Sequence, residues 1–445
     1  MKELKIDFLK NGLLNEGGLN YLDVTIKVFE DNAKKKNEKD NLFVFEIDAS
    51  GSMDCAATED SNRIVGYMSP MIGGINHRMY NEPFNTSNIT TRLDYAKKSV
   101  KNFIKLLSPK DKICIITFGS NAKIVQPITL LENESIKEEI YRHIDNINTS
   151  GCTNMGEGLQ YARELINEKS LKNYNCKIIV LSDGDVNMGM DQQDLVELSQ
   201  SFLEKGITLS SLGIGTDYNS KLMEDISTNL FYHIKDLSML DEILKEELSM
   251  NNRILYNNAK LKVKYNGLIE VGSNLNDLTE KVIENEKVIN LGNIISNVEK
   301  HIVFEINNEL EKEKIDFEVN LVLDENNIVT CKKNLNIVSK KELLEIEEDK
   351  EVAKRVVDLL KRKTIQKTSL DYMSNGDMTN VQSSLNDYTL KVGFISNAIG
   401  MSAGTEQLFN CSIEETRGIT SSYGESDANA MKNIYCSNSN KSRLD

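Results

Sequence analysis

In the central part of this sequence, short apolar runs are separated by longer segments in which apolar residues recur every three or four positions. The runs are typical of buried strands and the longer segments of helices packed on them, so their succession predicts a mostly parallel sheet with helices on both faces. A three-residue turn separates the second strand from the third, which we expect to be an antiparallel edge strand. We predict strands near residues 42–47, 112–118, 123–129, 177–182, 207–212 and 230–234, and helices near 91–107, 133–146, 156–169, 191–205, 219–228 and 236–250.

On both sides of this central part, polar and apolar residues alternate with a period of two. The alternation is clear in residues 21–28, 261–265, 302–306 and 317–323. It is typical of antiparallel strands with one buried face. Residues 1–38 are too few to bury a core alone. We therefore expect residues 1–38 and 253–339 to form one β-sandwich, with an α/β domain of residues 39–252 inserted into it.

The C-terminal part of the chain returns to helical spacing. Apolar residues in 340–397 form a stripe within a highly charged segment, and a turn at residues 374–377 divides it into two helices. We predict a helical hairpin there. Residues 398–445 are rich in Ser, Asn and Gly and lose this periodicity, so we expect a flexible tail. Its acidic residues could alternatively be bound by a partner or by a metal site of this chain.

Five oxygen-bearing side chains are expected at one edge of the predicted sheet. The strand at 42–47 leads into Asp48, Ser50 and Ser52, and the strand at 177–182 leads into Asp183. Thr153 lies in a polar loop that opens a helix. Ligands collect at the carboxyl ends of strands in an open parallel sheet. Carboxylate and hydroxyl oxygens suit Mg²⁺ or Mn²⁺, so we predict a site for one such ion.

These positions resemble the metal-ion-dependent adhesion site of the von Willebrand factor type A (VWA) domain, which uses an Asp-x-Ser-x-Ser turn, a distant Thr and a distant Asp before Gly. The resemblance extends from about residue 40 to about residue 250 and implies a Rossmann-like fold of a bacterial, intracellular type. It also implies that Ser50, Ser52 and Thr153 contact the metal directly or through water. Asp48 and Asp183 would hold it directly or through coordinated waters. One coordination position would remain for a Glu or Asp of a partner protein.

The sequence departs from this family between the turn and the first helix. The helix follows the turn closely in the family, whereas residues 54–90 intervene here. Two interpretations remain open. The insert is a tolerated surface loop, or it is a lid or partner-recognition loop beside the metal. Asp54 or Glu59 could also cap the metal in a resting state.

Composition narrows the functional classes further. The chain has 445 residues, enough for two or three domains, and a net charge of −15, which disfavours nucleic acids as partners. Its four histidines are isolated, without zinc-ligand spacing. The seven cysteines include no Cys-x-x-Cys, which favours a reducing compartment. Charges near the N-terminus disrupt any secretory signal, and no apolar run is long enough to span a membrane. We therefore expect a cytoplasmic protein.

We predict a metal-dependent protein–protein interaction module or adaptor, and not an enzyme. The resemblance suggests an AAA+ ATPase or another enzyme as partner, and self-association through the insert or tail is a further option. One alternative is a metal-dependent hydrolase with Asp185 or Glu157 as general base. Another is a structural subunit of a self-assembling complex. The chain has no phosphate-binding loop of the Gly-x-x-x-x-Gly-Lys-Ser/Thr type, which argues against nucleotide hydrolysis.

Overall fold

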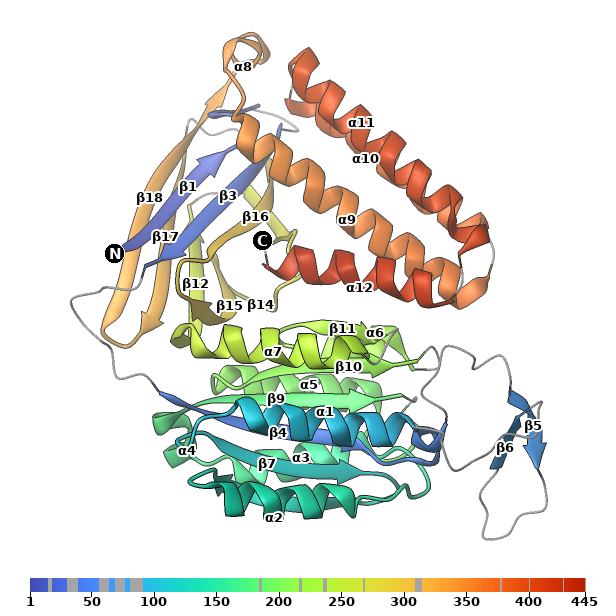
Figure 1. Cartoon of the computed structure of the whole chain (residues 1–445). Helices are drawn as coiled ribbons and strands as arrows, with labels where there is room; N and C mark the ends of the chain where they lie inside the picture. The colour runs from blue at the N-terminus through green and yellow to red at the C-terminus, as the bar shows by residue number, and fades with distance from the viewer. Residues whose placement is uncertain are drawn as a thin grey trace. The chain divides into compact units, whose positions relative to one another are not determined.

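The chain forms two compact units, one of which is inserted into the other. Residues 36–254 form the inserted unit, and residues 1–35 together with 255–445 form the host unit (Figure 1). This confirms the predicted insertion. The computed structural model describes residues 1–14, 18–29, 39–55, 64–68, 77–80, 91–183, 186–215, 218–234, 238–266, 269–308, 314–376, 378–399, 401–426 and 428–444.

The inserted unit is built on a six-stranded sheet of order β11-β10-β9-β4-β7-β8. Its strands are β4 (Asp40–Asp48), β7 (Lys112–Phe118), β8 (Ala122–Leu130), β9 (Tyr174–Ser182), β10 (Thr208–Ile214) and β11 (Phe231–Ile234). Neighbours are parallel except for β7 and β8, which confirms the expected antiparallel edge strand. In the ladder between β4 and β9, Ile47 pairs with Leu181. The carboxyl ends of these two central strands are therefore adjacent.

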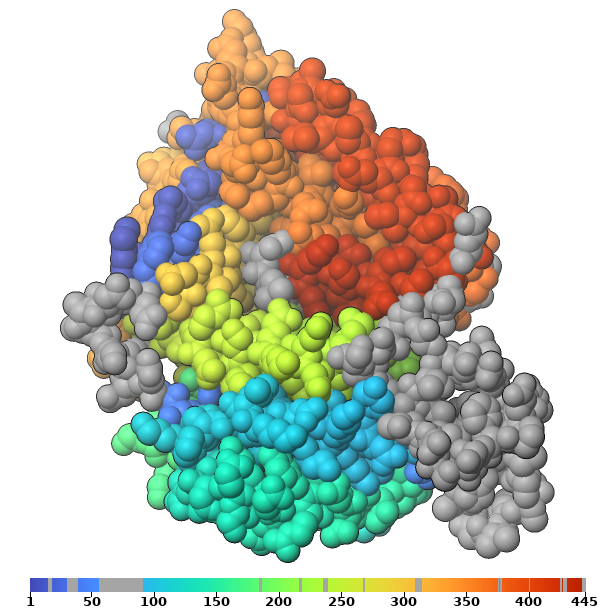
Figure 2. Space-filling model, viewed as in Figure 1, coloured from blue at the N-terminus to red at the C-terminus, as the bar shows by residue number. Residues whose placement is uncertain are grey.

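Helices cover both faces of this sheet, as the sequence predicts. Helices α1, α2 and α7 lie on one face, and α3, α5 and α6 lie on the other (Figure 1). Their bounds are α1 (Arg92–Leu106), α2 (Glu134–Asp145), α3 (Met155–Leu165), α5 (Gln192–Glu204), α6 (Ser220–Ile226) and α7 (Ser238–Asn252), with a short α4 (Glu168–Asn173) before β9. On the face shown in Figure 2, α1 and α2 form much of this unit's surface.

The apolar core under α1 explains how this face is held together. Phe43 and Phe45 of β4 point toward α1, where Phe103 contacts both edge-on, with ring centroids 4.8 and 5.3 Å apart. All three rings are buried. Aromatic residues at every second strand position and apolar residues at helical spacing therefore meet in one core. This core fixes β4, and with it the position of Asp48 at the end of the strand.

The opposite face of β4 contains a buried acidic side chain, Glu46. Neither carboxylate oxygen has a hydrogen-bond partner within the part of the chain that the structure describes. The carboxylate fits beside α3 because residue 158 is Gly, where a Cβ atom would lie 2.3 Å from Glu46 Oε2. Burial raises the pKa of Glu46 well above its ordinary value. The folded protein therefore favours the protonated side chain.

We expect Glu46→Met to stabilise the inserted unit at pH 8. The unfolded chain releases the proton of Glu46 near its ordinary pKa of 4.5, whereas the folded protein retains it to higher pH. The native state binds more protons between these limits, so its stability falls as pH rises. The free energy of unfolding should increase by about 1–3 kcal/mol at pH 8. The gain should shrink toward pH 4 in denaturant titrations. The exposed Glu139→Met is a control expected to change little, and a destabilised Glu46→Met protein would contradict this prediction.

The chain enters and leaves the inserted unit at one place. Asn41, at the start of β4, donates from Nδ2 to Oδ1 of Asn252, at the end of α7 (2.8 Å). Asn251 Nδ2 donates in turn to Asn41 Oδ1 (2.9 Å). The carboxylate of Asp111 accepts from the backbone N–H of Asn41 (2.8 Å). These side-chain hydrogen bonds connect the two ends of the unit directly.

The host unit contains the predicted β-sandwich. One sheet has the order β1-β3-β16-β13 and the other β14-β15-β12-β17-β18-β2, so N-terminal strands take part in both. Apolar residues of the two sheets form one core, in which β3 contributes Leu22, Val24 and Ile26. The strands are β1 (Lys2–Phe8), β2 (Gly12–Leu14), β3 (Gly18–Val28), β12 (Ile254–Tyr265), β13 (Ile269–Asn274), β14 (Glu280–Ile283), β15 (Glu286–Ile295), β16 (Glu299–Asn308), β17 (Lys314–Asp324) and β18 (Asn327–Val338).

The C-terminal part of the host unit is helical beyond the predicted hairpin. A short α8 (Lys340–Glu345) precedes α9 (Lys350–Asn375) and α10 (Thr379–Ile399), which form the expected pair. Gly376 ends α9 in a left-handed conformation (φ 68°), which suits Gly. Two further helices, α11 (Ala403–Ser421) and α12 (Ala428–Leu444), pack on α9. Among the described residues, no helix is both long and apolar enough to cross a bilayer.

Helices α11 and α12 lie where we predicted a flexible tail, and that prediction was wrong. The Ser-, Asn- and Gly-rich composition was misleading, and one reason is that hydroxyl side chains in this segment bond within their own helix. Thr416 Oγ1 donates to the carbonyl of Ser412 (2.7 Å), and Thr420 Oγ1 donates to that of Thr416 (3.0 Å). Thr416 and Thr420 can therefore be buried at little cost. Phe409 and Ile413 supply the apolar contacts of α11.

The structure describes only part of the insert at residues 54–90. Within it, β5 (Ile64–Met68) and β6 (His77–Tyr80) form an antiparallel pair. Most of the segment, including Glu59, lies outside the described residues. Asp54 is described, and its carboxylate accepts a hydrogen bond from Thr149 Oγ1 (2.6 Å). Asp54 is therefore bound to the loop that leads to Thr153.

Candidate metal centre

The site begins at the end of β4, where two donors fix the carboxylate of Asp48. The backbone N–H of Ser50 donates to Asp48 Oδ1 (2.8 Å), which closes the turn on itself. The hydroxyl of Ser182, at the end of β9, donates to Asp48 Oδ2 (2.6 Å). Asp48 is fully buried. Adjacent parallel strands thus bring the carboxylate and its second donor together.

Ser50, Ser52 and Asp183 continue from Asp48 in a connected set. The hydroxyl oxygens of Ser50 and Ser52 lie 3.0 Å apart. Ser52 Oγ donates to Asp183 Oδ1 (2.8 Å), so the turn after β4 is joined to the residue after β9. Asp183 is also fully buried. Four of the five predicted metal ligands are therefore linked by hydrogen bonds or by side-chain proximity.

The fifth predicted ligand, Thr153, lies on a loop that is bonded to the same turn. The backbone N–H of Gly51 donates to the carbonyl of Gly151 (3.1 Å), and that of Ser150 donates to the carbonyl of Ala49 (2.6 Å). Gly151 has a positive φ of 61°, which favours Gly at this bend. Thr153 is buried. Its backbone N–H donates to Asn187 Oδ1 (3.0 Å).

A cation of the protein itself lies against this set. Arg92 Nη1 is 2.5 Å from Asp183 Oδ2 in an ion pair that is almost wholly buried. Arg92 is the first residue of α1, and its backbone N–H donates to the carbonyl of Cys55 (3.0 Å). The two oxygens of Asp183 therefore have different neighbours. Oδ1 accepts from Ser52, and Oδ2 accepts from Arg92.

The two buried carboxylates of the site influence each other's charge. Burial and the neighbouring charge of Asp183 raise the pKa of Asp48 to about 7, although hydrogen bonds from Ser182 and Ser50 lower it. Two carboxylates are thus close together in a buried place, with hydroxyl oxygens beside them. Among the described residues, no three side chains of His, Cys, Asp or Glu come together as a metal site would require. The proposed site has two carboxylates, and its other oxygens are hydroxyls. The donor set fits a hard ion such as Mg²⁺, which accepts hydroxyl and water oxygens.

Sequence reasoning missed three residues that shape this site. Ser182 and Asn187 orient Asp48 and the Thr153 loop, and nothing in the sequence distinguishes them from other polar residues near a strand end. For Arg92, by contrast, the sequence did contain an indication. A positive side chain in the first turn of a helix opposes the helix dipole. Such a residue therefore needs an anion nearby, and here the anion is Asp183.

Of the two candidate general bases, only Glu157 lies among the described residues. Glu157 Oε2 accepts from the backbone N–H of Ala122 (2.9 Å) and from Asn154 Nδ2 (3.2 Å), so it joins the start of β8 to α3. Asp185 lies outside the described residues. Glu157 is therefore engaged in holding the fold.

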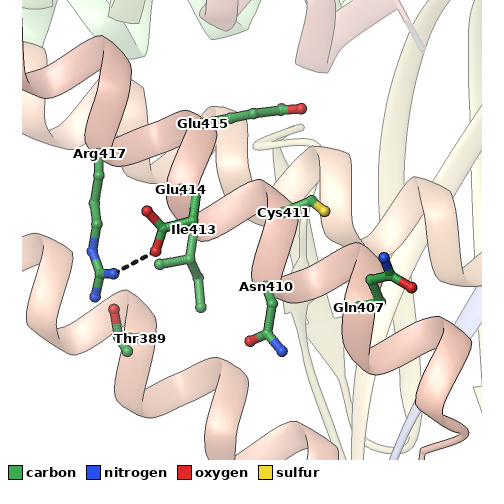
Figure 3. A pocket seen from close by; sticks show the side chains of 8 residues that line it. All are labelled: Thr389, Gln407, Asn410, Cys411, Ile413, Glu414, Glu415 and Arg417. Atoms are coloured by element: carbon green, nitrogen blue, oxygen red, sulfur yellow. Dashed lines mark hydrogen bonds and ion pairs between the residues drawn. The ribbon is translucent and has the colours of Figure 1, made fainter.

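A surface pocket of about 560 Å³ lies between α10 and α11 in the host unit and contains none of the predicted ligands. In Figure 3, Arg417 points toward Glu414, to which its Nη1 donates (2.6 Å). The pocket is open to solvent. Its lining residues are Thr389, Gln407, Asn410, Cys411, Ile413, Glu414, Glu415 and Arg417.

Comparison with known proteins identifies the fold of the inserted unit. Residues 85–246 match the family model of the von Willebrand factor type A domain. The match begins after the Asp48 turn, and β4 adds the central strand to the same sheet. An uncharacterized protein of Escherichia coli K12, YfbK, is 29% identical over 180 residues. That alignment covers 39% of this chain and 31% of the E. coli protein, so this chain spans less than a third of that relative.

Two solved structures resemble the whole chain. A von Willebrand factor type A protein from Catenulispora acidiphila superposes with a TM-score of 0.67 at 14% identity, covering 98% of this chain and 96% of the other. The ArnB paralog VWA2 from Sulfolobus acidocaldarius gives 0.54 at 15% identity, covering 93% and 98%. At such identities the similarity shows the fold alone. It extends over both units.

Proposed function

Since this chain contains a von Willebrand factor type A domain, we propose that it captures an acidic side chain of a partner protein through a divalent metal ion held by Asp48, Ser50, Ser52, Thr153 and Asp183. The observation that supports this most is the connection of the Asp48 turn to Asp183 through Ser52. Bound Mg²⁺ or Mn²⁺ would offer an open coordination position to a Glu or Asp carboxylate.

Each residue would have a definite task. Asp48 and Asp183 supply the negative charge that attracts the cation, and Ser50, Ser52 and Thr153 supply neutral oxygens. Because neutral ligands leave the ion's charge only partly compensated, a partner's carboxylate remains attracted to it. The Thr153 hydroxyl makes no hydrogen bond to any other described residue, which leaves its oxygen available.

We further propose a non-catalytic adaptor that works in the cytoplasm with an AAA+ ATPase or another enzyme as partner. Cys114 and Cys176 are free thiols, and both are buried. Unpaired buried thiols are typical of proteins from reducing compartments. The engagement of Glu157 with the start of β8 supports a role in binding over one in proton transfer.

The proposal is tested by removing the Thr153 hydroxyl. We expect Thr153→Val to weaken Mg²⁺ binding, measured by isothermal titration calorimetry, by roughly tenfold or more, because one oxygen ligand is replaced by a methyl group. Capture of a polyglutamate peptide should weaken in parallel and should disappear on addition of EDTA.

Thr153→Ser is the matched control, since it restores the hydroxyl and should bind Mg²⁺ nearly as the native protein does. Equal affinity of the Val and Ser variants would show that Thr153 is not a ligand. Capture that persists in EDTA would disprove the metal-dependent mechanism as a whole.

A further inference from the structure

The guanidinium of Arg92 is buried beside the proposed metal ligands, in a space that the surrounding residues leave for it. Its ion pair with Asp183 Oδ2 is buried on both sides, with side-chain exposures of 6% and 0%. Residue 215 is Gly, with a φ of 78°, and a Cβ atom there would lie 2.9 Å from Arg92 Nη2. A larger residue at 215 would displace the guanidinium. The fold therefore makes room for this cation at the edge of the site.

This position is unfavourable for a positive charge unless an anion compensates it. Arg92 begins α1, where the helix dipole repels cations, and burial removes the guanidinium from water. Asp183, which is also a proposed metal ligand, is one such anion. Arg92 and a metal ion would therefore share the charge of one carboxylate.

We propose that Arg92 is a positioning residue that weakens the hold of the centre on its metal and strengthens its hold on an acidic partner. This inference rests on the proposed function. The guanidinium of Arg92 adds a positive charge within hydrogen-bond distance of one proposed metal ligand, so the loaded centre is more positive than it would be without Arg92. That charge disfavours the metal in the absence of a partner. It favours the carboxylate that a partner brings.

The orientation of Asp183 supports this role of Arg92. Arg92 binds Oδ2, while Oδ1 accepts from the Ser52 hydroxyl. Asp183 is held by both contacts and presents Oδ1 on the side of the serine turn. Metal and partner binding then become coupled, because each reduces the charge that opposes the other.

The test compares Arg92→Gln with Arg92→Lys. Gln keeps a hydrogen-bond donor for Asp183 without the charge, and Lys keeps the charge. Calorimetry at pH 8 should show Arg92→Gln binding Mg²⁺ roughly tenfold or more tighter than the native protein. The Mg²⁺-loaded variant should bind polyglutamate peptide more weakly. Arg92→Lys should stay near native in both measurements.

Arg355→Gln is the matched control, because Arg355 Nε also pairs with a buried aspartate, Asp23 (2.7 Å), in the host unit. It should leave Mg²⁺ affinity unchanged. Should Arg92→Gln be unfolded without metal, circular dichroism should show that Mg²⁺ restores its fold.

Several results would overturn this role. Unchanged or weaker Mg²⁺ binding by Arg92→Gln would do so, as would unchanged peptide affinity or failure to fold at any Mg²⁺ concentration. Absence of Mg²⁺ binding by the native protein would instead reject the proposed function, and this inference with it.

Discussion

Asp48→Asn is expected to lower Mg²⁺ affinity by at least about 100-fold and to abolish capture of polyglutamate peptide. Loss of a group that merely supports a metal ligand often weakens binding 10- to 100-fold. Here one of the two carboxylates in the proposed site loses its charge. Asn retains an oxygen that can accept from the N–H of Ser50, so the turn should persist. Calorimetry with Mg²⁺ and circular dichroism would measure the two properties separately.

Asp225→Asn is a suitable control for this substitution. Asp225 belongs to the same unit, is not among the proposed ligands and pairs with Lys221 on the surface (2.5 Å). It should bind Mg²⁺ as the native protein does. Native-like Mg²⁺ affinity in a folded Asp48→Asn protein would exclude Asp48 as a ligand.

Lys177→Met is expected to produce a large loss of stability in the inserted unit, about 3–5 kcal/mol in the free energy of unfolding. Lys177 of β9 forms an ion pair with Glu247 of α7, and both side chains are almost completely buried. Ser210 Oγ also donates to Glu247 Oε1 (3.0 Å). Removal of the ammonium leaves a buried carboxylate without its counter-charge. Urea titrations of the native and variant proteins would measure the loss.

The double variant Lys177→Met with Glu247→Leu is the matched comparison. Well-packed apolar residues often replace a buried ion pair without loss, so the second substitution should restore most of the stability. The interaction energy from the double-mutant cycle should be large. A double variant as unstable as the sum of its single variants would show that the two charges act independently.

The inserted unit was predictable from sequence because its signals are local and repeated. Short buried runs such as Phe43–Ile47, separated by segments of helical length, are typical of the central strands of a parallel sheet. The carboxyl ends of such strands lie at the same edge of the sheet. The convergence of the Asp48 turn with Asp183 follows from that geometry. It required no knowledge of individual contacts.

Contacts between side chains of distant residues were not predictable in this way. The pair of Arg92 with Asp183 joins residues on different elements, and sequence indicates only that a buried positive charge near a helix start needs a partner. The helices after residue 402 were missed for another reason. Their hydroxyls bond to their own backbone and are buried against neighbouring helices, so composition alone resembled an unfolded segment.

The hydrogen bond between Asn41 and Asn252 has a consequence for how this protein can be rearranged. Because the two ends of the inserted unit are adjacent, the unit connects to its host at two nearby points, as a short loop would. Such a segment can be cut out with a brief linker, or given new termini by circular permutation, without stretching its own framework. The same geometry suits the insertion of other segments whose ends adjoin.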